Sequence, residues 1–154
     1  MTGFEKRSLG RTSVEVTVLG LGCATLGGHR VPVTPEEAEA IVRAAWARGV
    51  RYVDCAPFYG YGQAERCVGD TLREMSRDGW VLSTKVGRLL RPRTRVPASE
   101  PYRHPLPFNT AFDYTYDGVM LRSRTACSGW AWRGSTSSMH TTSERGSTRK
   151  RTRR

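Results

Sequence analysis

RYVDCAPFYGYGQAE, residues 51–65, decides the fold and points to the chemistry of this chain. Its apolar start predicts a strand that stops at 56–57, just after Asp54, and the Gly-rich turn that follows carries Tyr59. A second strand-like segment, WVLSTK, ends at Lys85. The carboxyl ends of parallel strands and the loops after them form the active face of an α/β barrel. We therefore expect these three side chains to share one site.

The segments before and between these strands have helical patterns. TPEE at 34–37 predicts a helix start, because Thr34 can cap it, Pro35 suits the first position and Glu37 can close a capping box. Apolar residues then recur at helical spacing up to Gly49, which is placed to end the helix; they are Ala38, Ile41, Val42, Ala45 and Trp46.

A second helix is predicted after the turn at 60–62, with an apolar face made of Val68, Leu72 and Met75. Residues 14–22, VEVTVLGLG, predict one or two short strands that open into the Gly-rich turn CATLGG. The order strand–helix–strand–helix–strand predicts a parallel sheet with helices packed outside it.

The rest of the chain has a different character. Residues 88–112 are rich in Arg and Pro and are expected to form a long loop, while 113–120 could open another helix. Residues 121–154 contain no Val, Ile or Phe and a single Leu, and they are dense in Ser, Thr and Arg. Such a segment buries too little apolar surface to offset its chain entropy, so we expect a disordered basic tail. The expected domains are therefore 1–120 and 121–154.

The net charge of +11 is concentrated in this tail. Residues 121–154 hold nine Lys and Arg against one acidic residue, and residues 1–120 hold 16 against 13. The body of the protein is thus nearly balanced, which argues against a nucleic-acid-binding domain. Non-specific contact of STRKRTRR, residues 147–154, with phosphates is the alternative that remains.

Other sequence features indicate a small cytoplasmic protein. The chain has no run of about 18 apolar residues that could span a membrane, and its N-terminus has no apolar core typical of a signal peptide. The four cysteines show neither CxxC spacing nor a disulfide framework, and Cys23 and Cys55 lie in apolar contexts. Buried thiols in a reducing compartment are the expectation.

The residue types at the strand ends suit proton transfer to a carbonyl. A free tyrosine gives up its proton poorly at neutral pH, and a neighbouring lysine ammonium favours the phenolate form. A carboxylate paired with the lysine keeps it charged and oriented. Tyr59 would then act as general acid or base, with Lys85 and Asp54 beside it. Each residue alone has a common structural role, as a cap, a packing residue or a solvated charge; their order and context together favour function.

The sequence resembles the aldo-keto reductases, and especially bacterial sugar dehydrogenases acting on L-fucose or D-threo-aldoses. The resemblance runs from about residue 7 to 120 and includes SLGRTSVEVTVLGLGCATLGG, the TPEEA helix start, VDCAPFYGYGQAE and VLSTKVGR. It implies a (β/α)8 barrel, NADP or NAD bound without a Rossmann fold, and hydride transfer to or from a carbonyl or aldose substrate. It also implies that Tyr59 is the proton donor and that Asp54 and Lys85 tune it.

The resemblance further places Gly22, Cys23 and Ala24, with Asp54, near the nicotinamide. Family members often have Thr and a bulky aromatic residue where this chain has Cys23 and Ala24.

One part of the family pattern is missing from the sequence. The resemblance implies a histidine at the end of a fourth strand, but no such strand is predicted. His29 and His104 lie in expected loops, and His140 lies in the Ser/Thr-rich run TSSMHTTS, where a solvated tail residue is expected.

A change of reading frame after about Met120 is one explanation for this loss. If each new codon takes the last base of one codon and the first two of the next, permissible codons from Thr125 onward give DSLQRLGLARIDILYAHDIG. This sequence contains a helix, an apolar strand and a His-Asp pair. A family barrel needs about 250 residues, so we expect a truncated barrel with open sheet edges, weak or no cofactor binding and negligible turnover.

Three functional hypotheses therefore stand side by side. The first is an aldo-keto reductase that is impaired by truncation. The second is a basic-tail protein that contacts nucleic acid, and the third is an inactive fragment. The sequence predicts neither the sugar nor the choice between NAD and NADP.

Overall fold

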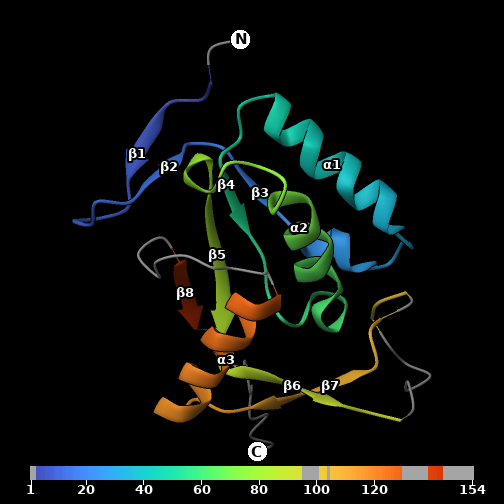
Figure 1. Ribbon diagram of the computed structural model, residues 1–154. Helices are drawn as coiled ribbons and strands as arrows, with labels where there is room; N and C mark the ends of the chain where they lie inside the picture. Colours follow the sequence, from blue (N-terminus) through green and yellow to red (C-terminus); the bar gives the residue numbers. More distant parts are fainter. Residues whose placement is uncertain (1–2, 95–100, 104, 130–138, 144–154) are drawn as a thin grey trace, which may run out of the picture.

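A computed structural model describes residues 3–94, 101–103, 105–129 and 139–143. Its helices and strands follow one another along the chain (Figure 1). In order they are β1 (Lys6–Ser8), β2 (Glu15–Thr17), β3 (Gly20–Gly22), α1 (Pro35–Ala47), β4 (Tyr52–Asp54), α2 (Gln63–Leu72), β5 (Val81–Val86), β6 (Arg88–Pro92), β7 (Phe108–Phe112), α3 (Tyr116–Gly129) and β8 (Met139–Ser143).

The central sheet confirms the predicted parallel α/β class. It has four parallel strands in the order β3-β4-β5-β8, with Gly22 opposite Asp54 and Asp54 opposite Ser83. Because all strands run the same way, their carboxyl ends lie at one edge of the sheet (Figure 1). Backbone hydrogen bonds continue past the strands there: Cys23 N–H donates to the Asp54 carbonyl and Cys55 N–H to the Ser83 carbonyl, both at 2.9 Å.

Local sequence signals explain where the first helix begins and ends. The Thr34 side chain accepts from the Glu37 backbone N–H, the Glu37 carboxylate accepts from the Thr34 N–H, and Pro35 is the first helical residue. Gly49 has a φ of +91°, a left-handed conformation that glycine adopts without steric cost. The predicted capping box and the predicted helix end are both confirmed.

The core lies between the sheet and the helices. Val53 and Leu82 point from β4 and β5 toward the helices, where they meet the buried Val42 of α1 and the buried Val68 and Leu72 of α2. Ile41, predicted to lie on the core face, is 42% exposed. In Figure 1 both helices lie on the same side of the strands, so the opposite face of β4 and β5 remains available for a site.

Two antiparallel hairpins lie near opposite ends of this sheet (Figure 1). β1 pairs with β2 near the amino ends, and β6 pairs with β7 near the carboxyl ends, in a register that sets Arg88 opposite Phe112. The expectation that residues 88–112 form one long loop was wrong over its two ends. The Arg and Pro residues led us to expect a loop, but they are tolerated in this hairpin because it lies at an edge, where its outer residues Arg91 and Pro92 are solvent-exposed.

The structure also differs from the expectation for the tail, within the ranges it describes. α3 runs through residue 120 to Gly129 without interruption, and Ala126 is buried in the core. Residues 139–143 form β8, which pairs in parallel with β5 along its last five residues. The β5 edge, expected to be open, is therefore covered there. The division into domains 1–120 and 121–154 stays a prediction.

Two further findings concern the described residues as a whole. Cys23, Cys55 and Cys67 are buried free thiols, and for Cys23 and Cys55 burial was expected from their apolar contexts. Among the helices in the described ranges, none combines the length and the apolar character needed to cross a membrane.

Candidate active site

Asp54 and Lys85 form an ion pair at the carboxyl edge of the sheet. Lys85 Nζ donates to Asp54 Oδ2 at 2.8 Å and to the Cys55 carbonyl at 3.0 Å. The two side chains are 17% and 35% exposed for Lys85 and Asp54 respectively, so the pair is partly shielded while it still faces solvent. This geometry follows from the register of two neighbouring parallel strands.

Tyr59 lies on the turn between β4 and α2 and is brought to the same place. Lys85 Nζ is 5.1 Å from the centroid of the Tyr59 ring. The turn Tyr59–Gly62 uses left-handed backbone conformations at its last three residues, with φ of +64° at Gly60 and +99° at Gly62. Glycine suits these two positions. The structure thus brings together all three side chains that the sequence singled out, while their catalytic roles stay a prediction.

The pKa of Lys85 reflects these neighbours. Burial alone lowers it, but the hydrogen bond and charge of Asp54, together with a smaller interaction with Tyr59, outweigh burial and raise the pKa above its ordinary value of 10.5. Lys85 therefore stays an ammonium over the whole physiological range.

The sequence prediction missed the residues that hold Asp54. Ser83 Oγ donates to Asp54 Oδ1 at 2.5 Å, and the Tyr52 hydroxyl lies 3.0 Å from Ser83 Oγ. Both carboxylate oxygens of Asp54 thus have a donor. Strand alternation could have revealed Ser83, because it lies two residues before Lys85 on the same face of β5.

Aromatic rings brace the turn that carries Tyr59. Phe58, Tyr61 and Tyr102 contact one another edge to face, with centroids 5.3–5.9 Å apart. The Arg88 guanidinium lies 4.3 Å from the centroid of the Phe58 ring. Tyr102 and Arg88 belong to the segment expected to be a loop, so sequence reasoning gave them no role.

The region predicted to lie near a nicotinamide has one open position. A Cβ added at Gly22 would meet no atom within 4 Å, and Gly22 lies directly opposite Asp54. The surface beside the ion pair is therefore open at Gly22. Ala24 is exposed, whereas Cys23 is fully buried, so the predicted contact of Cys23 with a nicotinamide does not fit this structure. Gly22 and Ala24 are thus accessible beside Asp54, while a cofactor role for these three residues stays a prediction.

The histidines have different positions. His29 is half-buried beside Tyr102, with ring centroids 5.6 Å apart, and His104 lies outside the described residues. The backbone of His140 lies in β8 opposite Ser83. The expectation that no strand includes His140 was wrong, because pairing with β5 supplies a strand that the sequence of this segment does not predict.

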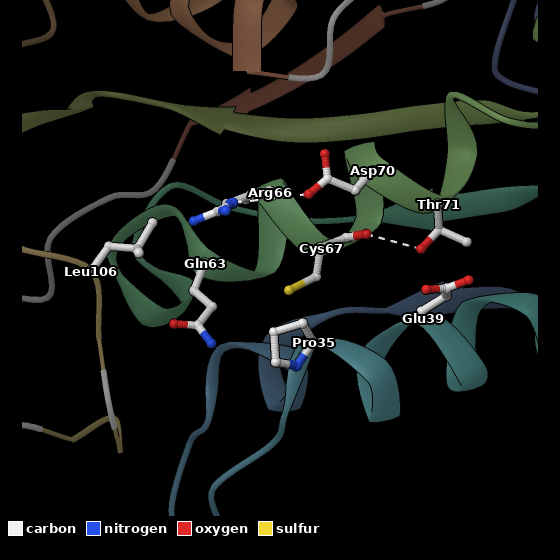
Figure 2. Close-up of a pocket in the computed structure, with 8 residues that line it drawn as sticks. All are labelled: Pro35, Glu39, Gln63, Arg66, Cys67, Asp70, Thr71 and Leu106. Atoms are coloured by element: carbon white, nitrogen blue, oxygen red, sulfur yellow. Dashed lines mark hydrogen bonds and ion pairs between the residues drawn. The ribbon is translucent and has the colours of Figure 1, made fainter.

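A separate hollow of about 230 Å³ lies between α1 and α2 (Figure 2). Its polar lining includes Glu39, Arg66 and Asp70, and Cys67 lies at its wall. Arg66 and Asp70 are 3.9 Å apart and more than half exposed, which is typical of a solvated helix surface. None of the three predicted catalytic side chains lines it.

The fold and the site geometry together define a class of protein. Its members are parallel α/β barrels with a lysine–carboxylate pair and a tyrosine at the carboxyl ends of the strands, and this chain forms part of such a barrel. The sequence pattern of the aldo/keto reductase family matches residues 18–113. The chain belongs to this family of oxidoreductases, which generally use nicotinamide cofactors.

Individual relatives agree with this assignment. The chain is 48% identical over 126 residues to a pyridoxal 4-dehydrogenase from Microbacterium luteolum, covering 75% of this chain and 36% of the relative. It is 40% identical over 99 residues to a D-threo-aldose 1-dehydrogenase from a Pseudomonas species, covering 64% and 28%. The chain therefore spans about a third of the length of these curated relatives.

A solved structure supports the fold. The aldo-keto reductase AKR11C1 from Bacillus halodurans superposes with a TM-score of 0.63 at 23% identity, covering 84% of this chain and 37% of that one. At this identity the likeness concerns the fold alone. It agrees with the prediction that the chain contains the first part of a (β/α)8 barrel.

Proposed function

We propose that this chain carries the proton-transfer site of an NAD(P)-dependent aldo-keto reductase that acts on the carbonyl of a small molecule. The observation that carries the proposal is the Lys85–Asp54 ion pair at 2.8 Å, with the Lys85 ammonium 5.1 Å from the Tyr59 ring centroid. An aldose or a pyridoxal-like aldehyde is the proposed substrate class, by analogy with the two curated relatives.

The proposed roles follow from the contacts. Tyr59 donates its hydroxyl proton to the carbonyl oxygen in reduction and accepts it back in oxidation. Lys85 stabilises the phenolate that forms, and Asp54 keeps Lys85 protonated and directed, itself held by Ser83. The open surface at Gly22 and the exposed Ala24 would hold the nicotinamide ring, with Asp54 next to it. When bound, the nicotinamide supplies or accepts the hydride.

An inactive fragment is the second candidate function. It differs from the first in predicting neither cofactor binding nor turnover, and the measurements below separate the two. The nucleic-acid hypothesis depends on residues 147–154, which lie outside the described residues.

Two measurements test the proposal. The first is reduction and oxidation of aldose and pyridoxal substrates with both cofactors, comparing Tyr59→Phe with Tyr116→Phe, whose side chain is 78% exposed on α3. We expect the first variant to lose turnover and the second to keep it. Equal turnover of Tyr59→Phe and the unaltered chain would refute the proposed role.

The second measurement applies if the turnover of the chain is too low for its variants to be compared. Fluorescence titration with NADPH and NADH is expected to show binding that Gly22→Val weakens, since the new side chain fills the open surface beside Asp54. Binding that is unaffected by Gly22→Val would place the cofactor elsewhere. No binding at all would favour the inactive fragment.

A further inference from the structure

A buried polar cluster joins three elements behind the candidate site. Arg122 Nη2 donates to Glu65 Oε1 and, at 3.1 Å, to Thr84 Oγ1, while Thr84 Oγ1 donates to the same Glu65 oxygen at 2.7 Å. Arg122 is 2% exposed, Glu65 7% and Thr84 0%. The three side chains therefore form a closed triangle that is excluded from solvent, and we call it the Arg122 cluster.

Two members of the Arg122 cluster, Glu65 and Thr84, lie close to site residues along the chain. Glu65 is in the first turn of α2, which begins directly after the turn that carries Tyr59. Thr84 immediately precedes Lys85 on β5, so the two side chains point to opposite faces of the sheet. Arg122, on α3, contacts both partners with one nitrogen and thereby fixes the start of α2 against the end of β5.

The Arg122 cluster contributes little to stability for the number of groups that it buries. A buried ion pair loses hydration that its attraction only partly returns, and apolar residues of similar volume are often as stable. Among the described residues, Arg122 Nε is buried without a hydrogen-bond partner, which adds a further cost. Directional hydrogen bonds, unlike apolar packing, fix the positions of α2, β5 and α3 relative to one another.

We propose that Arg122 is a positioning residue, which through Glu65 and Thr84 holds the turn carrying Tyr59 at a fixed distance from the strand carrying Lys85. The inference rests on the proposed function in taking Tyr59 and Lys85 as the reacting pair. It extends the site to a residue of α3 that contacts neither of them.

The test uses a cross-linking yield to report how close Tyr59 and Lys85 lie, so it does not depend on catalytic turnover. Difluorodinitrobenzene is a short reagent that links a free amine to a phenol, so the reaction is run at about pH 10, where part of the lysine is deprotonated. Mass spectrometry gives the yield of the Lys85–Tyr59 link relative to single addition at Lys6, which is exposed on β1. The double variant Glu65→Leu/Arg122→Met replaces the ion pair by apolar side chains. We expect it to fold and to lose about fivefold or more of the link, since reactions between held groups fall steeply with misplacement.

A second pair of variants keeps the ion pair and changes only its hydroxyl partner. Thr84→Val removes both hydrogen bonds of Thr84, and Thr84→Ser retains them. We expect a lower link yield in the valine variant and the original yield in the serine variant. If the double variant does not fold, this pair alone decides the question. Folded variants that all keep the original yield would overturn the proposal.

The outcome is separable from that of the proposed function. Turnover that survives Tyr59→Phe would refute the reductase mechanism, even if the link depends on Arg122. Conversely, a link that is insensitive to the Arg122 cluster would remove the positioning role and leave the roles of Tyr59 and Lys85 intact.

Discussion

Gly27 lies against the backbone of Tyr59, so close that no side chain fits between them. A Cβ at Gly27 would lie 2.5 Å from the Tyr59 carbonyl carbon and 2.5 Å from the Gly60 nitrogen. The 3-10 turn Ala24–Gly27 and the turn Tyr59–Gly62 can approach this closely because residue 27 has no side chain. The position of Tyr59 thus depends on a residue of an earlier loop.

The first prediction concerns this contact. Gly27→Ala should force the turn that carries Tyr59 to move and should lower the free energy of unfolding by about 1–3 kcal/mol, as overpacking does. Gly22→Ala is the matched control, since its new methyl group would meet no atom within 4 Å. Urea denaturation of both variants checks the prediction, and equal midpoints would contradict it.

The second prediction concerns the pH dependence of stability. The pKa of Lys85 is raised in the folded chain, so its ion pair with Asp54 stabilises fully below the unfolded pKa and is lost as pH rises through the folded pKa. Lys85→Met should cost about 1–2 kcal/mol at pH 7, less than for a fully buried pair because both side chains are partly exposed.

The loss caused by Lys85→Met should stay constant from pH 7 to about 10 and then shrink as the lysine of the unaltered chain deprotonates. Denaturant titrations across this range measure it, with Lys6→Met as the exposed control. A loss that instead grows above about pH 10 would contradict the sign of the shift.

The third prediction concerns the buried thiols. Burial, and next the neighbouring Cys23, raise the pKa of Cys55 well above its ordinary value of 9.0. Because the thiolate is the reactive form, iodoacetamide should label Cys55 at least about tenfold more slowly in the folded chain than in urea. Peptide mapping gives the rates at each cysteine, and equal rates in both states would show that this side chain is accessible.

The fourth prediction concerns the coding DNA. We propose that the frame changes after about Met120, and resequencing around that codon should reveal a shifted frame encoding the helix, strand and His-Asp pair described above. β8, at Met139–Ser143, falls on the codons for which that frame gives YAHDI. A DNA sequence without the shifted frame would remove this explanation for the composition of the tail.

Sequence reasoning succeeded where the signals are local or repeated along neighbouring strands. The Thr34–Glu37 capping box lies within one helical turn, and the pairing of Asp54 with Lys85 follows from two similar strands. It failed where contacts join distant residues. The hairpin partners Arg88 and Phe112 have no alternating apolar pattern that would reveal them.

The Arg122 cluster shows the same limit more sharply. Arg122 is 57 residues from Glu65 along the chain. The composition of residues 121–154 led us to expect a disordered tail there, and Arg122 lies in that segment. Its burial depends on where α3 packs, which the spacing of residues along the chain does not specify. Likewise, Met139–Ser143 has little apolar character, and it is strand β8 because β5 offers a row of backbone partners.

That row of partners also bears on solubility. With the outer side of β5 occupied, the border strands of the central sheet in the described part of the chain are β3 and β8, of three and five residues. Two of the three residues of β3 are glycines, so this border gives an incoming polypeptide few side chains to pack against. Short border strands disfavour edge-to-edge association between sheets of neighbouring molecules.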